Sequence, residues 1–401
     1  MLLDSAPRTW SSIEELHLQF CRVLVAHQTR PVLVFSEPLA EELTNRFRDS
    51  GAEIEAINYE DGIVNYYRQL RRLVRKHSIR TVHIGFFNYF HLIPWLARLA
   101  GMRQIVYQEH NSGVLEAKGP RRRLIRLRAR FLTMPMTRVI AISQFVKRQL
   151  IEIGIPEQKI WLVHHGVDTR RFLPNPSARE RWAQRFAIAP DELILGSVAH
   201  LRPFKHPEVI VEAIGLLVKR GVKARLFMAG TGEMRQELEQ LSRRLGISDR
   251  IHWLGSCNNV ENLLQASDIF VLASVGEAFG LVLTEAMACG VPVVGSRSGA
   301  IPEIVEDGLT GLLAKPLDSS SFADAIERLA RDGKLRREMG QRGRERVQQD
   351  FTAEMSIQKV LRVYESMWNG VNSEQTQATA SAACAAASQR ALNKTRGTSW
   401  H

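Results

Sequence analysis

Two glutamates, Glu277 and Glu285, lie eight positions apart in the stretch Glu-Ala-Phe-Gly-Leu-Val-Leu-Thr-Glu. Gly280 suits a turn into a helix, and the first N–H groups of a helix lack internal partners and can bind a diphosphate. The helix would separate the two carboxylates by about 10 Å along its axis. Carboxylates accept hydrogen bonds from paired hydroxyl groups, so this spacing fits a nucleotide-sugar, although such pairs also occur on solvated helix faces.

Cations that could neutralise a diphosphate follow an expected strand, in the segment Ala199-His-Leu-Arg-Pro-Phe-Lys205. Negative charge grows on the leaving diphosphate as a glycosidic bond breaks, so a fixed cation beside it stabilises the transition state. Lys205 is the first candidate, followed by Arg202 and His200. The alternative is that they are ordinary charged loop residues, but a loop after a parallel strand faces the ligand-binding edge of the sheet.

The glycines of Gly230-Thr-Gly232 follow the next expected strand. Glycine allows a phosphate or nucleoside to approach the backbone closely, so Gly232 is a candidate donor contact. Because the full G-x-G-x-x-G spacing is missing, a purely structural turn explains these glycines equally well.

Length and composition indicate a two-domain globular protein. The chain has 401 residues, 45% of them apolar, and this length exceeds the ~250 to 300 residues at which a single core usually stops growing. The absence of a run of about 18 apolar residues and of a secretory segment predicts a cytoplasmic protein. The four cysteines show no C-x-x-C spacing, so we expect neither disulfides nor a zinc site.

Short apolar runs alternate with helical patterns, which predicts β–α units on parallel sheets. The proline-containing segment Phe172-Leu-Pro-Asn-Pro-Ser interrupts this alternation, so we expect a domain boundary near residue 175. The expected strands are 32–35, 81–84, 104–107, 138–142 and 160–163 in the first half, and 193–197, 225–229, 251–254, 269–273 and 291–294 in the second.

The stretch from Glu277 to Glu285, with Gly290-Val-Pro-Val behind it, resembles the family 4 retaining glycosyltransferases. The resemblance extends from residue 193 to about 364, and more thinly from 104 to 174. It implies the GT-B fold, in which two doubly wound Rossmann-like α/β domains face each other across a cleft. In that family the first glutamate lies beside the donor sugar and the second binds the ribose.

The segment from Ala199 to Lys205 resembles the family's G-R-L-x-x-x-K, in which an arginine and a lysine hold the phosphates. It therefore indicates further donor contacts. His200 stands in the place of that arginine, so we expect Arg202 to supply the contact instead. The predicted donor-binding residues are His200, Arg202, Lys205, Gly232, Glu277, Phe279, Gly280, Leu281 and Glu285.

His110 follows the expected strand 104–107 and resembles a family histidine that reaches the donor sugar and shapes the acceptor site. With Glu277 and Lys205 it completes the predicted catalytic set, although a lone histidine is often structural. The family's Gly-Gly pair after the first strand is missing, and Ser11-Ser12-Ile-Glu14 stands in its place.

The resemblance also implies a division of the chain. We expect an acceptor-binding domain at 1–175, a nucleotide-sugar-binding domain at 176–350, and a helix at 351–369 that crosses back to the first domain. The Ala-, Ser- and Gln-rich composition of 370–401 predicts a disordered tail.

The net charge of +12 arises entirely in residues 1–185, which hold 29 basic and 17 acidic residues. The segment 121–132 places leucines among arginines at helical spacing, which is typical of a cationic helix on an anionic membrane. A solvated helix packed on its own sheet explains the pattern equally well, and no nucleic-acid-binding motif accompanies it. The predicted acceptor or membrane contacts are His110, Arg121, Arg122, Arg123 and Arg126.

These features predict a cytoplasmic enzyme, peripheral at the inner membrane face, that moves a hexose from a UDP- or GDP-linked donor to a glycan or lipid-linked acceptor. Its expected place is the synthesis of cell-surface polysaccharide or glycolipid. No D-x-D cluster is evident and cationic side chains can replace a divalent ion, so we expect neither a metal nor another cofactor. The alternatives are a sugar-nucleotide epimerase of the same architecture and a non-catalytic protein that binds membrane or nucleic acid.

Overall fold

A computed structural model describes residues 1–3, 7, 10–58, 62–86, 91–111, 120–257 and 259–368, without the side chains of 120–122. The chain divides into two units, Met1–Ile357 and Gln358–His401. The first unit contains both sheets, and the described part of the second is the end of helix α15 (Ala353–Trp368). The tail predicted to be disordered, 370–401, lies outside the described residues.

The first sheet has seven strands in the order β3-β2-β1-β4-β5-β6-β7, and its pairings are parallel. The strand order reverses between β1 and β4, so the sheet is doubly wound and ligand-binding loops gather at the carboxyl ends of its strands. The strands are β1 (Leu2–Leu3), β2 (Val32–Phe35), β3 (Glu53–Ala56), β4 (Thr81–Gly85), β5 (Gln104–Glu109), β6 (Arg138–Ala141) and β7 (Ile160–Leu162).

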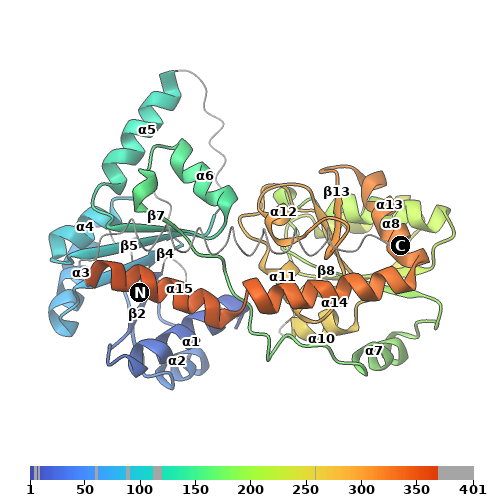
Figure 1. Ribbon diagram of the computed structural model, residues 1–401, viewed down its shortest axis with the longest axis horizontal. Coiled ribbons are helices and arrows are strands. Elements are labelled where there is room, and N and C mark those ends of the chain that lie inside the picture. Colours follow the sequence, from blue (N-terminus) through green and yellow to red (C-terminus); the bar gives the residue numbers. More distant parts are fainter. Residues whose placement is uncertain are drawn as a thin grey trace, which may run out of the picture. The chain divides into compact units, whose positions relative to one another are not determined.

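Both faces of this sheet are covered by helices (Figure 1). Leu33 of β2 packs in a cluster with Phe47, whereas the adjacent Val32 and Val34 pack in a cluster with Tyr66. Successive strand residues point to opposite faces, so a continuously apolar strand is buried on both sides. The helices are α1 (Ser12–Ala26), α2 (Glu41–Arg48), α3 (Ile63–His77), α4 (Ile93–Ala100), α5 (Pro120–Thr133), α6 (Gln144–Glu152) and the 3₁₀ helix η1 (Glu157–Lys159).

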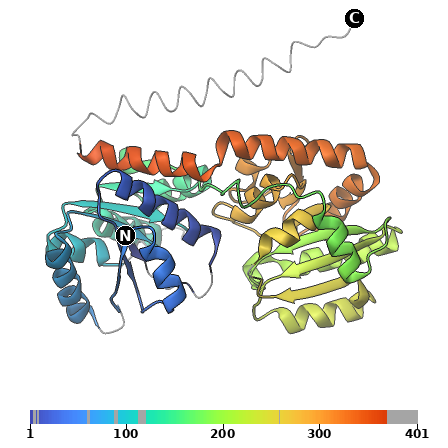
Figure 2. The same ribbon diagram turned by 90° about the horizontal axis from the view of Figure 1, so that it is seen from below.

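The second sheet repeats this topology with six strands in the order β10-β9-β8-β11-β12-β13. Its switch point lies between β8 and β11, and helices again cover both faces (Figure 2). The strands are β8 (Leu193–Val198), β9 (Ala224–Ala229), β10 (Ile251–Gly255), β11 (Ile269–Leu272), β12 (Val293–Ser296) and β13 (Gly311–Ala314). The helices are α7 (Ala178–Phe186), η2 (Pro203–Lys205), α8 (Pro207–Lys219), α9 (Arg235–Arg244), η3 (Ser248–Arg250), α10 (Val260–Ala266), α11 (Leu281–Ala288), α12 (Ile301–Ile304), α13 (Ser319–Arg331) and α14 (Gly333–Asp350).

The expected α/β class with two doubly wound parallel sheets is confirmed. All ten expected strands are present, with β12 starting at Val293 rather than 291. The edge strands β3 and β13 were not expected; β3 is partly solvent-exposed and reads Glu-Ile-Glu-Ala, so it lacks an apolar run. A helix is present where 351–369 was expected, but its crossing onto the first domain and the domain limits stay predictions.

Candidate active site

Glu277 lies in the loop between β11 and α11, at the carboxyl end of the second sheet's strands. The turn after β12 holds its backbone, because the Ala300 N–H donates to the Glu277 carbonyl oxygen at 2.8 Å. A Cβ atom at Gly299 would lie 2.5 Å from both the nitrogen and the oxygen of Glu277, so this approach requires glycine. Gly280, with a φ of +96°, is the N-cap of α11, so Glu277 lies just outside the mouth of a helix.

Lys205 pairs directly with Glu277. Its Nζ atom lies 2.7 Å from Glu277 Oε2, and the two side chains are 19% and 16% exposed. Lys205 ends the short η2 helix after β8, and β8 neighbours β11 in the sheet. The structure therefore brings together two of the three residues predicted to be catalytic.

His200 and Arg202 lie in the same loop as Lys205, but their side chains are exposed. Among the described residues, neither side chain makes a hydrogen bond or an ion pair. Gly232 has a packing role, because a Cβ atom there would lie 2.2 Å from the carbonyl oxygen of Leu201. The donor contacts predicted for these three residues therefore stay predictions.

Glu285 lies on α11 and is only 7% exposed. The Ser12 hydroxyl, in the first turn of α1, donates a hydrogen bond to Glu285 Oε1. Burial raises the pKa of the Glu285 carboxyl, whereas the Ser12 hydrogen bond and the nearby Arg171 guanidinium oppose this shift. Ser12 was not predicted as a site residue, although its segment replaces the family's Gly-Gly pair.

His110 belongs to a column of aromatic rings at the carboxyl ends of β4, β5 and β7. Its ring stacks on Phe86 at 4.0 Å and on His165 at 5.2 Å between centroids. His165 meets Phe279 of the Glu277 loop edge to face at 5.7 Å. Phe279 is therefore buried in this column, and the column connects His110 to the loop that carries Glu277.

His110 is neutral, because burial and the neighbouring His165 lower its pKa well below the usual value. Its buried Nδ1 atom has no hydrogen-bond partner in the described part of the chain. A neutral imidazole has one donor and one acceptor nitrogen, so His110 can hydrogen-bond to a substrate hydroxyl.

Further buried histidines lie near His110, and they are not among the predicted site residues. Burial lowers the pKa of His17 and of His83 to about 3, and that of His165 to about 4. These side chains are therefore neutral near pH 7 and add no charge to the site.

Glu109 is a second titratable group that sequence reasoning missed. Its carboxylate accepts hydrogen bonds from the Tyr107 hydroxyl at 2.9 Å and the Asn111 N–H at 2.8 Å. Burial outweighs these bonds and raises the pKa of Glu109 to about 7. The sequence feature that could have identified Glu109 is its position beside His110 at the end of an apolar strand.

Helix α6 of the first sheet contacts the Glu277 loop through its N-terminus. The Ser143 hydroxyl donates to the Ala278 carbonyl oxygen at 2.6 Å and accepts from the Val146 N–H at 3.1 Å. The Glu303 carboxylate of α12 accepts from the Gln144 N–H at 2.7 Å, which satisfies a free donor of the helix end. The Ser143 bond fixes α6 to the residue beside Glu277, and the Glu303 bond fixes it to α12.

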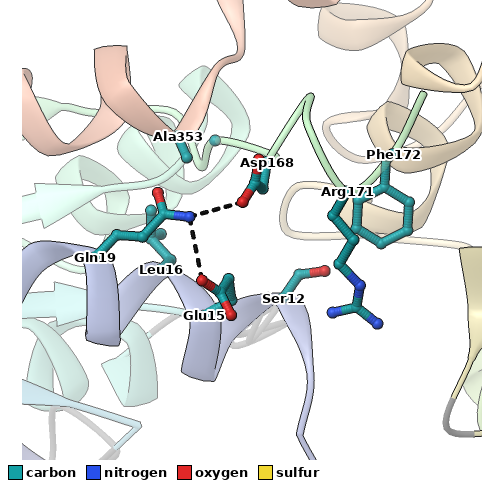
Figure 3. Close-up of a pocket in the computed structure, with 9 residues that line it drawn as sticks. Ser12, Glu15, Leu16, Gln19, Asp168, Arg171, Phe172 and Ala353 are labelled. Atoms are coloured by element: carbon teal, nitrogen blue, oxygen red, sulfur yellow. Dashed lines mark hydrogen bonds between the residues drawn. The ribbon is translucent and has the colours of Figure 1, made fainter. Parts of the chain in front are cut away.

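A narrow polar seam lies between α1 and the segment after β7 (Figure 3). The Gln19 side-chain amide donates to Asp168 at 2.9 Å and to Glu15 at 3.3 Å. The side chains of the lining residues fill the seam, so we assign the seam a structural role.

The cationic helix α5 exposes most of its large apolar residues. Leu124, Leu127 and Phe131 are 67%, 68% and 57% exposed, while Ala129 and Leu132 face the interior. The explanation in which the leucines pack on the sheet is therefore wrong for Leu124 and Leu127. Arg123 is exposed, Arg126 donates from Nε to the Glu152 carbonyl oxygen at 2.8 Å, and the side chains of Arg121 and Arg122 lie outside the described residues.

Within the described ranges, no group of three or more His, Cys, Asp or Glu side chains is arranged to hold a metal ion. The expectation that no metal or cofactor is needed stays a prediction. Among the helices that the structure describes, none has the length and apolar character needed to span a membrane.

Two family descriptions match the chain: "Glycosyltransferase Family 4" over residues 14–171 and "Glycosyl transferases group 1" over 178–346. The N-acetyl-alpha-D-glucosaminyl L-malate synthase of Bacillus anthracis is 35% identical over 233 residues, which are 58% of this chain and 59% of the relative. The GDP-mannose-dependent alpha-(1-6)-phosphatidylinositol monomannoside mannosyltransferase of Mycolicibacterium smegmatis is 30% identical over 287 residues, 69% of this chain and 74% of the relative. The match to the Bacillus anthracis protein spans about three fifths of its length.

Solved structures show the same fold. Anabaena HepE, solved in complex with UDP-glucose, matches with a TM-score of 0.77 and 20% identity, covering 91% of this chain and 99% of HepE. WaaG, a glycosyltransferase of lipopolysaccharide biosynthesis, matches with a TM-score of 0.67 and 17% identity, covering 88% and 96%. The fold is therefore GT-B.

Proposed function

The chain belongs to the family 4 glycosyltransferases, and on this premise we propose that it transfers a hexose from a nucleoside diphosphate to a hydroxyl group with retention of configuration. The observation that carries this proposal is the Lys205–Glu277 pair at the mouth of α11. It combines a cation for a diphosphate, a carboxylate for sugar hydroxyls and the free N–H groups of a helix end.

In the proposed reaction, the bond between the anomeric carbon and the diphosphate oxygen breaks while the acceptor oxygen bonds to the same face of that carbon. The acceptor's proton passes to the leaving phosphate oxygen. Lys205 neutralises the charge that grows on the diphosphate, which is where an electrostatic contact accelerates the step most. Glu277, released from Lys205, accepts hydrogen bonds from the hexose.

Glu285 binds at the ribose end of the donor, and His110 binds at the end where the hexose meets the acceptor. Glu285 accepts the ribose hydroxyls in place of the Ser12 hydroxyl that occupies it in the free protein. His110 offers a nitrogen of its neutral ring to a hydroxyl of the donor sugar or the acceptor.

We propose a UDP- or GDP-linked hexose as the donor. A structural neighbour was solved with UDP-glucose and a relative is named as GDP-mannose-dependent, so the comparisons support both bases. Lys205 supplies the charge neutralisation that a divalent ion would otherwise give. Activity should therefore persist in a chelator, and complete loss that magnesium restores would contradict this part.

We propose a glycan or lipid-linked acceptor, used in cell-surface polysaccharide or glycolipid synthesis at the cytoplasmic face of a membrane. The support is the α5 stripe of exposed Leu124, Leu127 and Phe131 among arginines, which fits the surface of an anionic bilayer. One relative is named for a phosphatidylinositol-based substrate. Nucleic acid is not proposed as a partner.

The test begins with thermal stabilisation by UDP- and GDP-sugars, followed by incubation of the best donor with membrane extract. Transfer of the hexose into the lipid or glycan fraction supports the proposal. Conversion of the donor sugar in the absence of acceptor would instead support an epimerase. Unchanged transfer by Glu277→Ala would contradict the assigned site.

A further inference from the structure

Helix α3 carries a row of arginines that the donor site does not use. The row lies on the exposed side of the helix, opposite the buried Leu70 and Leu73, with spacings of three and four residues that bring its members onto one face. It lines a hollow of about 590 Å³ together with Tyr67 and Lys76. Its members are Arg68, Arg71, Arg72 and Arg75.

These arginines are not paired with carboxylates in the described part of the chain. Among the described residues none of the four makes an ion pair, whereas the adjacent Lys76 lies 2.6 Å from Glu55. Like charges three or four residues apart destabilise a helix, and only Arg75, in the last turn, benefits from the helix dipole. The row is therefore better suited to an anionic ligand than to helix stability.

The row borders exposed apolar surface through α4. The Tyr67 hydroxyl of α3 donates to the carbonyl oxygen of Leu99, whose side chain is 66% exposed. One turn earlier on α4, Trp95 stacks on Phe131 of α5 with 5.1 Å between ring centroids. Helices α3, α4 and α5 are thus neighbours and lie on the left of Figure 1.

We propose that the α3 arginine row binds the phosphate headgroups of an anionic lipid bilayer, as the cationic part of a docking face shared with the exposed apolar residues of α4 and α5. Arginine binds phosphate through paired N–H donors, which suits a surface of repeated phosphates. The inference rests on the proposed function, because a membrane-held acceptor gives the docking face its use.

A bilayer fits this face better than nucleic acid does. Leu99, Leu124 and Leu127 are each about two thirds exposed, and a bilayer offers an apolar phase for them, whereas a duplex offers none. The α3 row then supplies the charge attraction to the bilayer, and the exposed apolar residues of α5 insert into it.

The test uses the full chain and vesicles of phosphatidylcholine, with or without phosphatidylglycerol, at low and high salt. One variant carries Arg68→Gln, Arg71→Gln, Arg72→Gln and Arg75→Gln. A matched control removes four exposed cations elsewhere through Lys219→Gln, Arg243→Gln, Arg244→Gln and Arg337→Gln. A third variant carries Leu124→Ser and Leu127→Ser.

We expect the wild type to bind the anionic vesicles and to be released by salt. Each cation near such a surface contributes roughly fivefold, so loss of all four arginines should weaken vesicle binding by up to roughly 600-fold. The control should bind like the wild type, and the leucine variant should bind more weakly at every salt concentration. Equal binding by the arginine variant and the wild type, equal loss in the control, or duplex DNA binding as tight as vesicle binding would overturn the inference.

Donor stabilisation and transfer to a water-soluble acceptor are measured on the same proteins. Both should be equal in the wild type and the arginine variant, because the row is remote from Lys205 and Glu277 in the fold. Vesicle binding without donor binding would contradict the proposed function alone, and donor binding without vesicle binding would contradict the docking face alone.

Discussion

Lys205 and Glu277 neutralise each other in the free protein at a distance of 2.7 Å. Both side chains are mostly buried, so the cost of desolvating the two charges offsets most of their attraction and the pair contributes little to the free energy of folding. The pair matters because the donor can replace each of its partners. An entering diphosphate binds Lys205, and Glu277 is then free to bind the sugar. Substitution here should therefore change kinetics more than stability.

For Lys205→Ala we expect kcat/KM to fall by roughly a hundredfold to a thousandfold, as for the loss of one group that stabilises developing charge. The thermal midpoint should stay within a few degrees of that of the wild type. Steady-state kinetics and thermal unfolding of the same samples measure both quantities, with Lys219→Gln as the control for charge. A kcat/KM within a factor of three of the wild type would remove Lys205 from the mechanism.

Glu109 gives a pH dependence of stability with a defined sign. Its pKa is about 7 in the folded protein against an ordinary value of 4.5, so the folded state binds more protons between these values. Stability from this group is therefore full below pH 4.5 and is lost as the pH rises through 7, by up to about 3 kcal/mol. The lowered pKa values of His17 and His83 give the opposite slope, with stability lost as the pH falls below 6.5.

The difference between Glu109→Gln and the wild type isolates the carboxyl group, because the histidines are common to both. We expect the variant to gain stability relative to the wild type as the pH rises from 4.5 to 8, measured as urea midpoints across this range. A constant difference would show that Glu109 titrates normally.

Among the elements, the turn between β12 and α12 sets the position of the Glu277 loop. Gly299→Ala should destabilise the protein by about 2 to 4 kcal/mol, because its new Cβ meets backbone atoms of Glu277 at 2.5 Å and the φ is +63°. Gly221→Ala is the matched control, with a φ of +74° and no atom within 4 Å of the Cβ, and should cost about 1 kcal/mol. Equal urea midpoints for the two variants would contradict the close packing.

Ser143, the N-cap of α6, both stabilises this helix and holds the Glu277 loop. Ser143→Ala removes both the cap and the bond to the Ala278 carbonyl oxygen, so we expect a loss of about 1 kcal/mol together with a lower kcat. Asp318→Ala removes the cap of α13, whose side-chain partners in the described part of the chain do not include the Glu277 loop, and should cost similar stability without affecting kcat. Equal kcat values in the two variants would show that α6 does not position the loop.

At the scale of the whole molecule, the sequence indicated the architecture more completely than it indicated the contacts. Strands such as β8 and β11 are buried on both faces, so each appears in the sequence as a run of apolar residues. The polar edge strand β3 shows no such run. The pairing of Lys205 with Glu277 depends on β8 and β11 being neighbours, and strand order is not written in local patterns. Spacing likewise could not show that Glu285 is covered by Ser12, 273 positions away in the chain.

Calorimetric titration of UDP- and GDP-hexoses into the wild type, Lys205→Ala and Glu277→Ala measures directly whether the Lys205–Glu277 pair binds the donor. We predict one-to-one binding of one nucleotide-sugar by the wild type, weakened at least about tenfold in each variant, as expected for loss of a charged contact. The unsubstituted nucleoside diphosphate should lose affinity in Lys205→Ala but not in Glu277→Ala. Wild-type affinity for the nucleotide-sugar in both variants would contradict the account.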